Sequence, residues 1–475
     1  MKKVFYISTA LPYVNSAPHL GFALEAVQAD VLARYHRLLK KDVFFLTGTD
    51  EHGAKVARAA KEAGKTPEEF TDEISGKFKA LKEVLNLSND DFIRTTDQQR
   101  HWPAVKKAWL KLKENGDVYL KKYKGLYCPG CEAFITKKDL INGECAIHRI
   151  KPEIIEEENY FFKLSKYSQK IEKAIETDEL RIIPESRKHE VLNFIKQGLE
   201  DVSFSRPRKD LKWGIPVPGD DSQTIYVWAD ALTNYISAIG YFEESENFNK
   251  RWPADIHCIG KDILKFHAVY WPAMLLALGL ELPKNIFVHG FITVGGQKMS
   301  KSLGNVINPF DLVEKYGTDA VRLFLLREIS PTEDGDFTEE KFKIRYNADL
   351  ANGLGNFAAR ILALKYQLPE IKTGKPKSDI DSKIKETEKS VARKLEEFKF
   401  NEALAAIWDL IAFGDKHLNE TQVWKIADVK VKTEIVADLA ALLNSIADIL
   451  SPFLPETVAK ISRLKKGEIL FPRLN

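Results

Sequence analysis

Cysteine is scarce in this sequence, with four residues among 475. Three of the four, Cys128, Cys131 and Cys145, lie within eighteen residues of one another. A disulfide framework would need more cysteines, spread along the chain, whereas such a cluster is typical of a metal site in a reducing compartment. The sequence therefore argues against a disulfide-stabilised secreted protein.

Long apolar runs are also missing. The longest, at 268–280, contains Pro272 and is shorter than the roughly 20 residues that a membrane-spanning helix needs. The apolar run at 4–7 is too short for the core of a signal peptide and is soon followed by Pro12. We therefore expect a cytoplasmic protein with no membrane partner.

A strong excess of charge is absent too, because the net charge is only +3. If RNA binds, local patches and particular side chains must provide the binding. The composition, 44% hydrophobic and 29% charged, is that of a folded globular protein. The length suits about three domains of roughly 100–200 residues each.

The first part of the chain reads as a strand at 4–7, a helix at 23–39 and a strand at 43–46. Continuous apolar strands around a helix predict a βαβ unit of a buried parallel sheet. A second such stretch occurs downstream, with a strand at 255–259, a helix at 263–278 and a strand at 286–288. The two stretches predict an α/β, Rossmann-like nucleotide-binding domain that an insertion splits in two.

The remaining chain is expected to be helical. Leu350, Leu354, Phe357, Ile361 and Leu364 recur at steps of four and three, as in an amphipathic helix. Such helices predict an all-α bundle, and the charged segment 372–389 is expected to be a solvated connection. The predicted domains are 1–115, the first half of the sheet domain; 116–223, the insertion; 224–343, the second half; and 344–475, the helical domain.

The loop after the first strand carries a phosphate-binding signal. Residues 10–22 read Ala-Leu-Pro-Tyr-Val-Asn-Ser-Ala-Pro-His-Leu-Gly-Phe and end at a predicted helix N-terminus. The N–H groups and dipole at a helix N-terminus favour phosphate. His19 can donate to a phosphate oxygen there, and Gly21 lets a nucleotide approach the backbone.

A second loop carries a more specific phosphate-binding signal. Residues 294–302 read Val-Gly-Gly-Gln-Lys-Met-Ser-Lys-Ser and follow a predicted strand. The two glycines predict a mobile loop, on which Lys298 and Lys301 present two compact cations. Such cations can stabilise charge that develops on a polyphosphate during displacement at its α-phosphate.

His-Leu-Gly in the first half of a split sheet domain, with Lys-Met-Ser-Lys-Ser after the second half, resembles the class I aminoacyl-tRNA synthetases. From end to end the chain is similar to the methionyl-tRNA synthetase family. The sequence blocks that carry the resemblance are 10–13, 47–53, 226–232, 259–263, 266–267 and 271–272.

The resemblance implies that the enzyme activates methionine with ATP and transfers it to tRNA. Residues His19, Lys298 and Lys301 would be catalytic. Methionine would be held by Leu11, Tyr13, Asp50, Trp228, Ala231, Tyr235, Phe266 and His267, with Asp50 on the ammonium group. ATP, accompanied by Mg²⁺, would contact His19, Gly21, Glu25, Gly260, Asp262, Ile292 and Lys301.

The chemistry of methionine suits these assignments. A thioether is apolar and flexible, so an aromatic cage with one carboxylate for the amine is a sensible receptor. The methionine carboxylate is already ionised near neutral pH, so activation needs alignment and stabilisation of leaving pyrophosphate, and no general base.

One position departs from the family. Its His-x-Gly-His motif ends here in Phe22, where a second phosphate-contacting histidine is expected. Loss of one preorganised donor typically costs about 2.7–4 kcal/mol. We expect the rest of the site to compensate, and a tRNA-binding relative with impaired activation is the alternative.

The cysteine cluster predicts a zinc site. Cys128 and Cys131 form one Cys-x-x-Cys pair, and Cys145 with His148 forms a second pair after a short loop. Four protein ligands of this kind suit one tetrahedral, structural Zn²⁺. The resemblance places such a zinc knuckle in the insertion, near the tRNA acceptor end.

The helical region carries the expected RNA signal. Asn352, Asn356 and Arg360 are four residues apart and form one row that points away from the apolar stripe. The resemblance implies that this row and Trp424 read the CAU anticodon of tRNA(Met), by hydrogen bonds to base edges and by stacking. Val423 stands where the family usually has proline.

The nearest competitor within the class is a cysteinyl-tRNA synthetase, which would grip a thiolate with zinc ligands scattered along the chain. Here the ligands are clustered in the insertion. Longer members of the family append a tRNA-binding, dimerising domain, and because this chain stops at Asn475 a monomer is expected.

Overall fold

The structure is a computed structural model that describes residues 3–130, 133–135, 139–147, 149–299, 304–368, 376–465 and 467–475. Its chain forms two compact units. The sheet unit comprises residues 1–18, 39–80 and 89–289, and the helical unit comprises residues 19–38, 81–88 and 290–475. Within the described part of the chain, no helix is long and apolar enough to cross a membrane.

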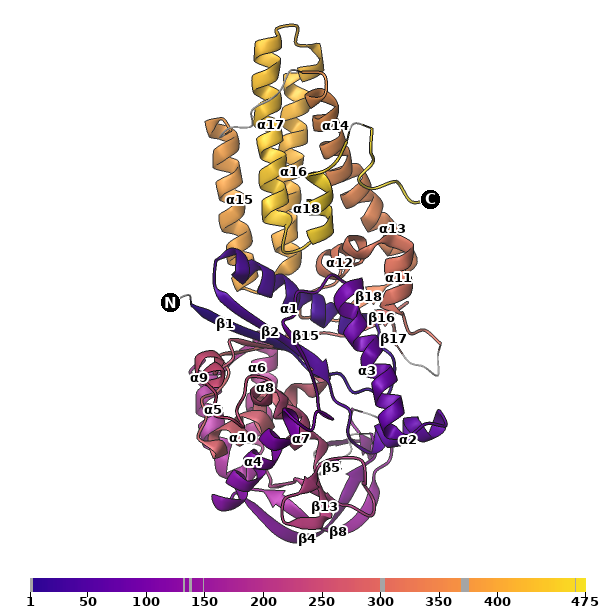
Figure 1. Ribbon diagram of the computed structural model, residues 1–475, viewed down its shortest axis with the longest axis vertical. Helices are drawn as coiled ribbons and strands as arrows, with labels where there is room; N and C mark the ends of the chain where they lie inside the picture. The colour runs from indigo at the N-terminus through magenta and orange to yellow at the C-terminus, as the bar shows by residue number, and fades with distance from the viewer. Residues whose placement is uncertain are drawn as a thin grey trace. The chain divides into compact units, whose positions relative to one another are not determined.

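A six-stranded parallel sheet forms the centre of the sheet unit (Figure 1). Its strand order is β3-β2-β1-β14-β15-β9, so the direction of winding reverses between β1 and β14. In such sheets, ligands bind outside the carboxyl ends of the strands at the reversal. The strands are β1 (Val4–Thr9), β2 (Asp42–Thr49), β3 (Asp91–Arg94), β9 (Arg181–Ile183), β14 (Ile256–Gly260) and β15 (Asn285–His289).

The predicted α/β class is confirmed, with both predicted halves contributing to one sheet. Ile7 pairs with Ile256 across the β1–β14 junction. One feature was not predicted: β9 lies within 116–223 but joins the main sheet beside β15. A strand of three residues carries too little periodicity to be recognised in the sequence.

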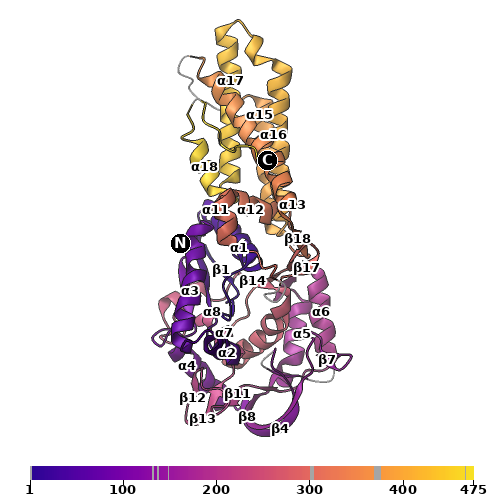
Figure 2. The same ribbon diagram turned by 90° about the vertical axis from the view of Figure 1, so that its right-hand side faces the viewer.

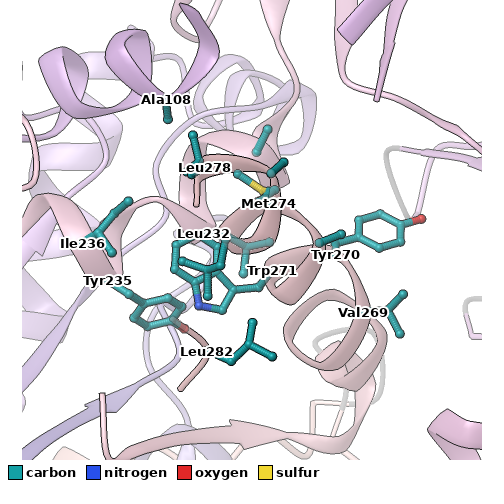
Figure 3. Close-up of a cluster of buried hydrophobic side chains, with 14 of the residues drawn as sticks. Ala108, Leu232, Tyr235, Ile236, Val269, Tyr270, Trp271, Met274, Leu278 and Leu282 are labelled. Atoms are coloured by element: carbon teal, nitrogen blue, oxygen red, sulfur yellow. The ribbon is translucent and has the colours of Figure 1, made fainter. Parts of the chain in front are cut away.

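The core of the sheet unit lies between the sheet and the short helices that pack against it. Figure 3 shows the buried indole of Trp271 among Leu232, Tyr235, Met274 and Leu282. The helices around this core are α4 (His101–Glu114), α5 (Ser168–Glu176), α6 (Glu185–Lys196), α7 (Val227–Leu232), α8 (Asn234–Ser237) and α10 (Trp271–Leu278).

The segment 263–278 was predicted as one helix and is instead broken. It comprises the 3₁₀ turn η3 (Lys261–Ile263), the π-helix η4 (Phe266–Tyr270) and α10. Pro272, near the start of α10, has no N–H to donate to the preceding turn, which favours a change of helix type there. π-Helical turns often mark functional sites.

The rest of the sheet unit is an antiparallel region plus peripheral helices. Strand β4 pairs with β8 over most of its length, and β5 and β10 complete that sheet. The strands are β4 (Val118–Cys128), β5 (Ala133–Ile135), β6 (Leu140–Ile141), β7 (Glu144–Cys145), β8 (Glu153–Phe162), β10 (Val202–Ser203), β11 (Ser205–Pro207), β12 (Pro216–Val217) and β13 (Asp220–Ile225). The other helices are α2 (Ala54–Glu62), η2 (Leu164–Tyr167), α9 (Glu246–Arg251) and α3 (Pro67–Val84), whose last turn belongs to the helical unit.

In the helical unit, α15, α16 and α17 lie side by side with their axes roughly aligned (Figures 1 and 2). The helices are α1 (Leu20–Leu38), α11 (Pro309–Tyr316), α12 (Thr318–Arg327), α13 (Glu339–Arg345), η6 (Tyr346–Gly355), α14 (Asn356–Lys365), α15 (Ser378–Glu396), α16 (Phe400–Thr421), η7 (Val423–Lys425), α17 (Val429–Leu450) and α18 (Pro455–Ile461). A small sheet contains β16 (Ile292–Val294), β17 (Gln297–Lys298) and β18 (Gly335–Phe337).

Two predictions for the helical region need correction. Residues 378–389, predicted as part of a solvated connection, belong to α15, which buries Ile380 and Ile384 against the bundle. The amphipathic segment that begins at Leu350 is π-helical up to Gly355 before it becomes α14. In α15 the many charged residues hide a narrow apolar stripe, whereas in η6 the apolar spacing does not reveal the change of helical period.

A buried ion pair fixes α1 within the helical unit. Arg322 lies 2.8 Å from Asp30 of α1, and both side chains are inaccessible to solvent. The guanidinium also donates to the carbonyl oxygens of Phe453 at 2.8 Å, Leu85 at 3.0 Å and Pro452 at 3.0 Å. With each of its three nitrogens bound to an acceptor, this arginine holds the helix that begins with the His-Leu-Gly motif.

Candidate functional site

Four aromatic side chains form a group in the sheet unit, called here the aromatic cluster: Trp228, Tyr235, Phe266 and His267. The rings of Trp228 and Phe266 stack with centroids 3.8 Å apart and planes 5° from parallel. The Tyr235 hydroxyl lies 2.8 Å from Nε2 of His267. The sequence predicted these four residues as one pocket wall, and the structure brings them together.

The protonation of His267 follows from its two partners. Its Nδ1 lies 3.0 Å from the carbonyl oxygen of Ile263, which can only accept, so Nδ1 carries the proton. Nε2 therefore accepts from the Tyr235 hydroxyl. Burial lowers the pKa of His267 to about 4, although the bond to Ile263 opposes this shift. The imidazole is thus neutral at physiological pH, and the cluster carries no net charge.

A buried carboxylate lies at the end of β2. Asp50 donates its backbone N–H to Pro12 at 3.0 Å, and its carbonyl accepts from Val14 at 3.0 Å. These bonds join the loops that follow β1 and β2 at the carboxyl edge of the sheet. Leu11 and Tyr13, on the first loop, pack against the same core as Trp228 and Phe266. Ala231 is buried on α7, beside Trp228 in the sequence.

Gly260 and Asp262 lie at the end of β14, next to the reversal of strand order. A Cβ on Gly260 would come within 2.8 Å of the Asp262 carboxylate and 3.7 Å of the His289 ring. Only glycine fits this position without a shift of its neighbours. The exposed Asp262 therefore stands beside a bare stretch of backbone, an arrangement that can admit a ribose or a base.

The helical unit contains the predicted phosphate motifs. At the start of α1, Gly21 donates its N–H to Nδ1 of His19 at 3.1 Å, and His19 is exposed. A Cβ on Gly21 would lie 2.9 Å from the His19 ring and 3.8 Å from Cε of Met299. The helix N-terminus and the lysine-bearing hairpin are thus close neighbours. Glu25 is buried in α1 and Ile292 in β16.

A tight turn shapes that hairpin. Gly295 and Gly296 have φ values of 58° and 76°, a conformation that favours glycine and suits a two-residue β-hairpin. Asp336 accepts from the N–H of Gly296 at 2.7 Å and from the hydroxyl of Thr293 at 2.8 Å. The first of these bonds does most to lower the pKa of Asp336 below its usual value.

Lys298 follows the turn and is exposed, with its ammonium group 4.9 Å from the centre of the Phe291 ring. The backbone position of Lys298 pairs with Thr293 on the opposite strand. Lys301, the second predicted cation, lies outside the described residues. The sequence did not predict Asp336, since nothing near residue 336 links it to a hairpin forty residues earlier.

Two of the four predicted zinc ligands are described. Cys128 and Cys145 are buried in one small cluster with Ile135. Cys131 and His148 lie outside the described residues. Among the residues that are described, no group of three or more histidine, cysteine, aspartate or glutamate side chains is arranged so that it could hold a metal ion. The two described thiols share one cluster, as ligands of a common ion would.

The predicted RNA-reading row lies on η6 and α14. Asn352 and Asn356 are exposed, whereas Arg360 donates to Asp415 at 2.8 Å and to Asn419 at 2.5 Å. Its guanidinium also lies 5.9 Å from the centre of the Trp424 ring, which is 48% exposed. The row therefore points away from the apolar stripe. Val423 is fully buried and anchors the turn that presents the indole.

Comparisons with known proteins agree with this geometry. Residues 5–139 and 134–362 match the family model described as tRNA synthetases class I (M). The methionine–tRNA ligase of Caldanaerobacter subterraneus subsp. tengcongensis is 43% identical over 510 residues, covering 100% of this chain and 80% of the relative. That of Thermotoga maritima is 45% identical over 476 residues, covering 97% and 75%.

Solved structures show the same likeness. Mycobacterium tuberculosis methionyl-tRNA synthetase in complex with methionyl-adenylate matches with a TM-score of 0.90 at 38% identity, over 99% of this chain and 97% of that chain. The apo form of the same enzyme matches with a TM-score of 0.85 at 34% identity, over 100% and 99%.

Proposed function

This chain belongs to the methionyl-tRNA synthetase family of class I, and from that premise we propose how its residues divide the reaction. It acts as a methionine–tRNA ligase. The methionine carboxylate attacks the α-phosphate of ATP, so that a bond to phosphorus forms and pyrophosphate leaves. The 3′ adenosine of tRNA then attacks the activated carbonyl and releases AMP.

The amino-acid side of the reaction is assigned to the sheet unit. One observation carries this assignment: the buried Asp50 is hydrogen-bonded through its backbone to the loop after β1, whose Leu11 and Tyr13 pack on the same core as the aromatic cluster. The carboxylate would hold the ammonium group, and the uncharged cluster would receive the thioether. The other methionine contacts would come from Leu11, Tyr13 and Ala231.

Methionine-dependent ATP–pyrophosphate exchange tests this side of the site. The chain should exchange with methionine and discriminate strongly against cysteine, because a thiol fills less of an aromatic pocket. Asp50→Ala should raise the KM for methionine by about 10²-fold, since a charged hydrogen bond and an ion pair are both lost. An unchanged KM would refute the assignment of Asp50.

The phosphate side is assigned to the helix N-terminus and the hairpin. His19 would donate to a phosphate oxygen, and Lys298 and Lys301 would neutralise charge on the leaving pyrophosphate, which Mg²⁺ accompanies. The closeness of Gly21 and Met299 supports this division. Further ATP contacts would come from Glu25 and Ile292 in the helical unit and from Gly260 and Asp262 in the sheet unit.

On the phosphate side, Phe22 replaces the second histidine of the family's motif. We expect the unmodified chain to catalyse exchange, because His19 and Lys298 are both present on neighbouring elements. Phe22→His should then raise the rate by less than the roughly 10²–10³-fold that one preorganised donor can supply. If the unmodified chain showed no exchange, it would instead be a tRNA-binding protein with impaired activation.

Zinc is assigned to the segment 116–223. Cys128, Cys131, Cys145 and His148 would hold one ion that fixes the short β5–β7 region, a structural role with no open position for substrate. The shared burial of Cys128 and Cys145 supports this assignment. Elemental analysis should find one zinc per chain in the unmodified protein and none in Cys145→Ser, and a full zinc content in that variant would contradict it.

The tRNA side is assigned to the exposed row. Asn352, Asn356, Arg360 and Trp424 would read the CAU anticodon, with the indole as a stacking platform. The exposure of the two asparagines and of Trp424 supports this assignment. Charging of a tRNA transcript with a CAU anticodon should exceed that of a transcript altered only in the anticodon, and equal charging would refute it.

A further inference from the structure

A buried carboxylate on α7 has two histidine partners. Oδ2 of Asp230 lies 2.6 Å from Nδ1 of His52, and Oδ1 lies 2.7 Å from Nε2 of His101. All three side chains are almost completely buried. The reaction described above uses none of them.

The carboxylate of Asp230 is ionised. Burial raises its pKa, but the two imidazoles, first that of His52, outweigh burial, so the pKa lies below the ordinary value. A carboxylate can only accept, so the two facing imidazole nitrogens both donate to it. These are charge-assisted hydrogen bonds, which are stronger and more directional than neutral ones.

His52 lies two residues after Asp50, in a loop that is fixed at every position that follows Asp50. The carboxylate of Glu51 binds Arg94 through two bonds of 2.7 and 2.9 Å. The backbone of Glu51 accepts from the Trp213 indole at 2.6 Å, and Gly53 donates to the Trp213 carbonyl at 3.1 Å.

The ring of His52 is itself held in place by aromatic contacts. It makes edge-to-face contacts with Trp102 and Trp213, with centroid distances of 5.8 and 5.5 Å. These two contacts and the 2.6 Å bond from Nδ1 to Asp230 together fix the orientation of the imidazole. The ring has little freedom to turn away from that carboxylate.

The same carboxylate connects this loop to the aromatic cluster. Asp230 stands on α7 two residues after Trp228 and one before Ala231. Its N–H donates to the carbonyl of Tyr226, so the helix backbone around it is regular. Any displacement of the His52–Asp230 bond would therefore move the Asp50 loop relative to α7.

We propose that Asp230 and His52 are positioning residues that set the separation between the Asp50 carboxylate and the aromatic cluster, and so determine how tightly methionine's ammonium group is held. This inference rests on the proposed role of Asp50. Stability alone does not account for the arrangement, because well-packed apolar residues often replace buried ionic groups without loss of stability. A fixed geometry does account for it.

The test compares two ligands by calorimetric titration of the full chain. Methionine uses Asp50, whereas its deamino analogue has the same side chain and carboxylate but no ammonium group. Asp230→Asn replaces one acceptor oxygen with a donor that faces an imidazole N–H. We expect this variant to bind methionine about tenfold more weakly and to bind the analogue within about twofold of the unmodified chain.

A matched pair at residue 52 checks the direction of the effect. The amide nitrogen of asparagine stands near the place of the imidazole Nδ1, so His52→Asn keeps a donor to Asp230. His52→Leu has similar bulk and no donor. The asparagine variant should bind methionine within about threefold of the unmodified chain, and the leucine variant about tenfold more weakly. Thermal unfolding of both variants verifies that they fold. If Asp230→Asn does not fold, the two variants at residue 52 test the positioning role by themselves.

The outcomes separate this inference from the proposed function. If Asp50→Ala leaves methionine affinity unchanged, the role assigned to Asp50 is wrong. If Asp50→Ala weakens binding but Asp230→Asn and His52→Leu do not, only the positioning role is wrong. Equal weakening for methionine and its analogue also overturns that role, because the effect would then reach the whole pocket.

Discussion

The proposed methionine side of the site and the proposed phosphate and RNA contacts at His19 and Asn352 differ in how deeply their polar residues are buried. In the sheet unit, Asp50, His267 and Asp230 are buried, and the His267 and Asp230 side chains accept hydrogen bonds from Tyr235 and His52. In the helical unit, His19 and Asn352, the candidate contacts to phosphate and RNA, are exposed.

The difference follows from the ligands. A small zwitterion offers few groups, so selectivity for it requires a dry pocket whose polar atoms are fixed in advance. Phosphates and RNA bases offer many groups and strong charge, so exposed side chains can recognise them and some ordering can wait until binding. Substitutions in the aromatic cluster and its core should therefore affect stability and methionine affinity, whereas substitutions at the lysine-bearing hairpin and the RNA-reading row should affect nucleotide or tRNA kinetics.

The largest expected difference is between alanine substitutions of a buried tryptophan, Trp271, and an exposed one, Trp424. Trp271→Ala should lower the free energy of unfolding by about 3–5 kcal/mol, because it empties the fully buried centre of the core in Figure 3. Trp424→Ala should change it by less than about 0.5 kcal/mol but raise the KM for tRNA roughly tenfold, because a stacking surface is lost. Urea denaturation and aminoacylation measure the two effects.

A control separates volume from hydrogen bonding at the buried position. The indole N–H of Trp271 has no hydrogen-bond partner within the described structure, so Trp271→Phe should retain much of the stability that Trp271→Ala loses. Equal losses of stability in Trp271→Ala and Trp424→Ala would contradict the contrast between buried and exposed sites.

Lowering the pH should reduce the stability of the sheet unit through His267. Its pKa falls from 6.5 to about 4 on folding, so below pH 6.5 the unfolded chain binds a proton that the folded chain does not. Stability is therefore lost as pH falls from 6.5 towards 4, by about 3 kcal/mol from this residue. Denaturation across that range should show a shallower loss in His267→Gln, and parallel curves would contradict the neutral, buried imidazole.

Most of the fold could be predicted from the sequence because its strands and helices are strongly patterned. Continuous apolar strands at 4–7 and 43–46 indicated a parallel sheet, and the stripe from Leu350 to Leu364 indicated a buried helix face. The π-helical turns could not be predicted, because a single extra residue per turn leaves the apolar spacing almost unchanged. The short strand β9 could not either, since tertiary pairing with β15 creates it.

The candidate site divides in the same way. Contiguous motifs identified His19, Lys298 and the aromatic residues. The residues that hold them in place were missed, because Asp336 and Asp230 find their partners 40 or more positions away in the chain. Such support depends on three-dimensional proximity, for which one sequence carries no local pattern.

Asp336 combines features of both sides of the site, because it is a hydrogen-bonded acceptor that supports an exposed hairpin. Asp336→Ala removes the acceptor for Gly296 and Thr293, so Lys298 should lose its preset position. The kcat of pyrophosphate exchange should fall about tenfold with little change in the KM for methionine. Lys341→Ala, which removes only an exposed ion pair to Asp336, should stay within about twofold. A rise in the KM for methionine in Asp336→Ala would contradict the assignment of the hairpin to the phosphate side alone.

The smallest expected effect concerns Arg360, the half-buried member of the row, which Asp415 and Asn419 hold in place. Its fork binds Asp415 and Asn419, and lysine cannot reproduce two parallel bonds, so Arg360→Lys should raise the KM for tRNA about fivefold. Pyrophosphate exchange, which involves no tRNA, should not change. Arg345→Lys is the matched control, because Arg345 also binds two side chains, the carboxylates of Glu328 and Asp349, but belongs to no RNA-reading row. If both variants raised the KM equally, the effect would come from the packing of the helical unit and not from anticodon recognition.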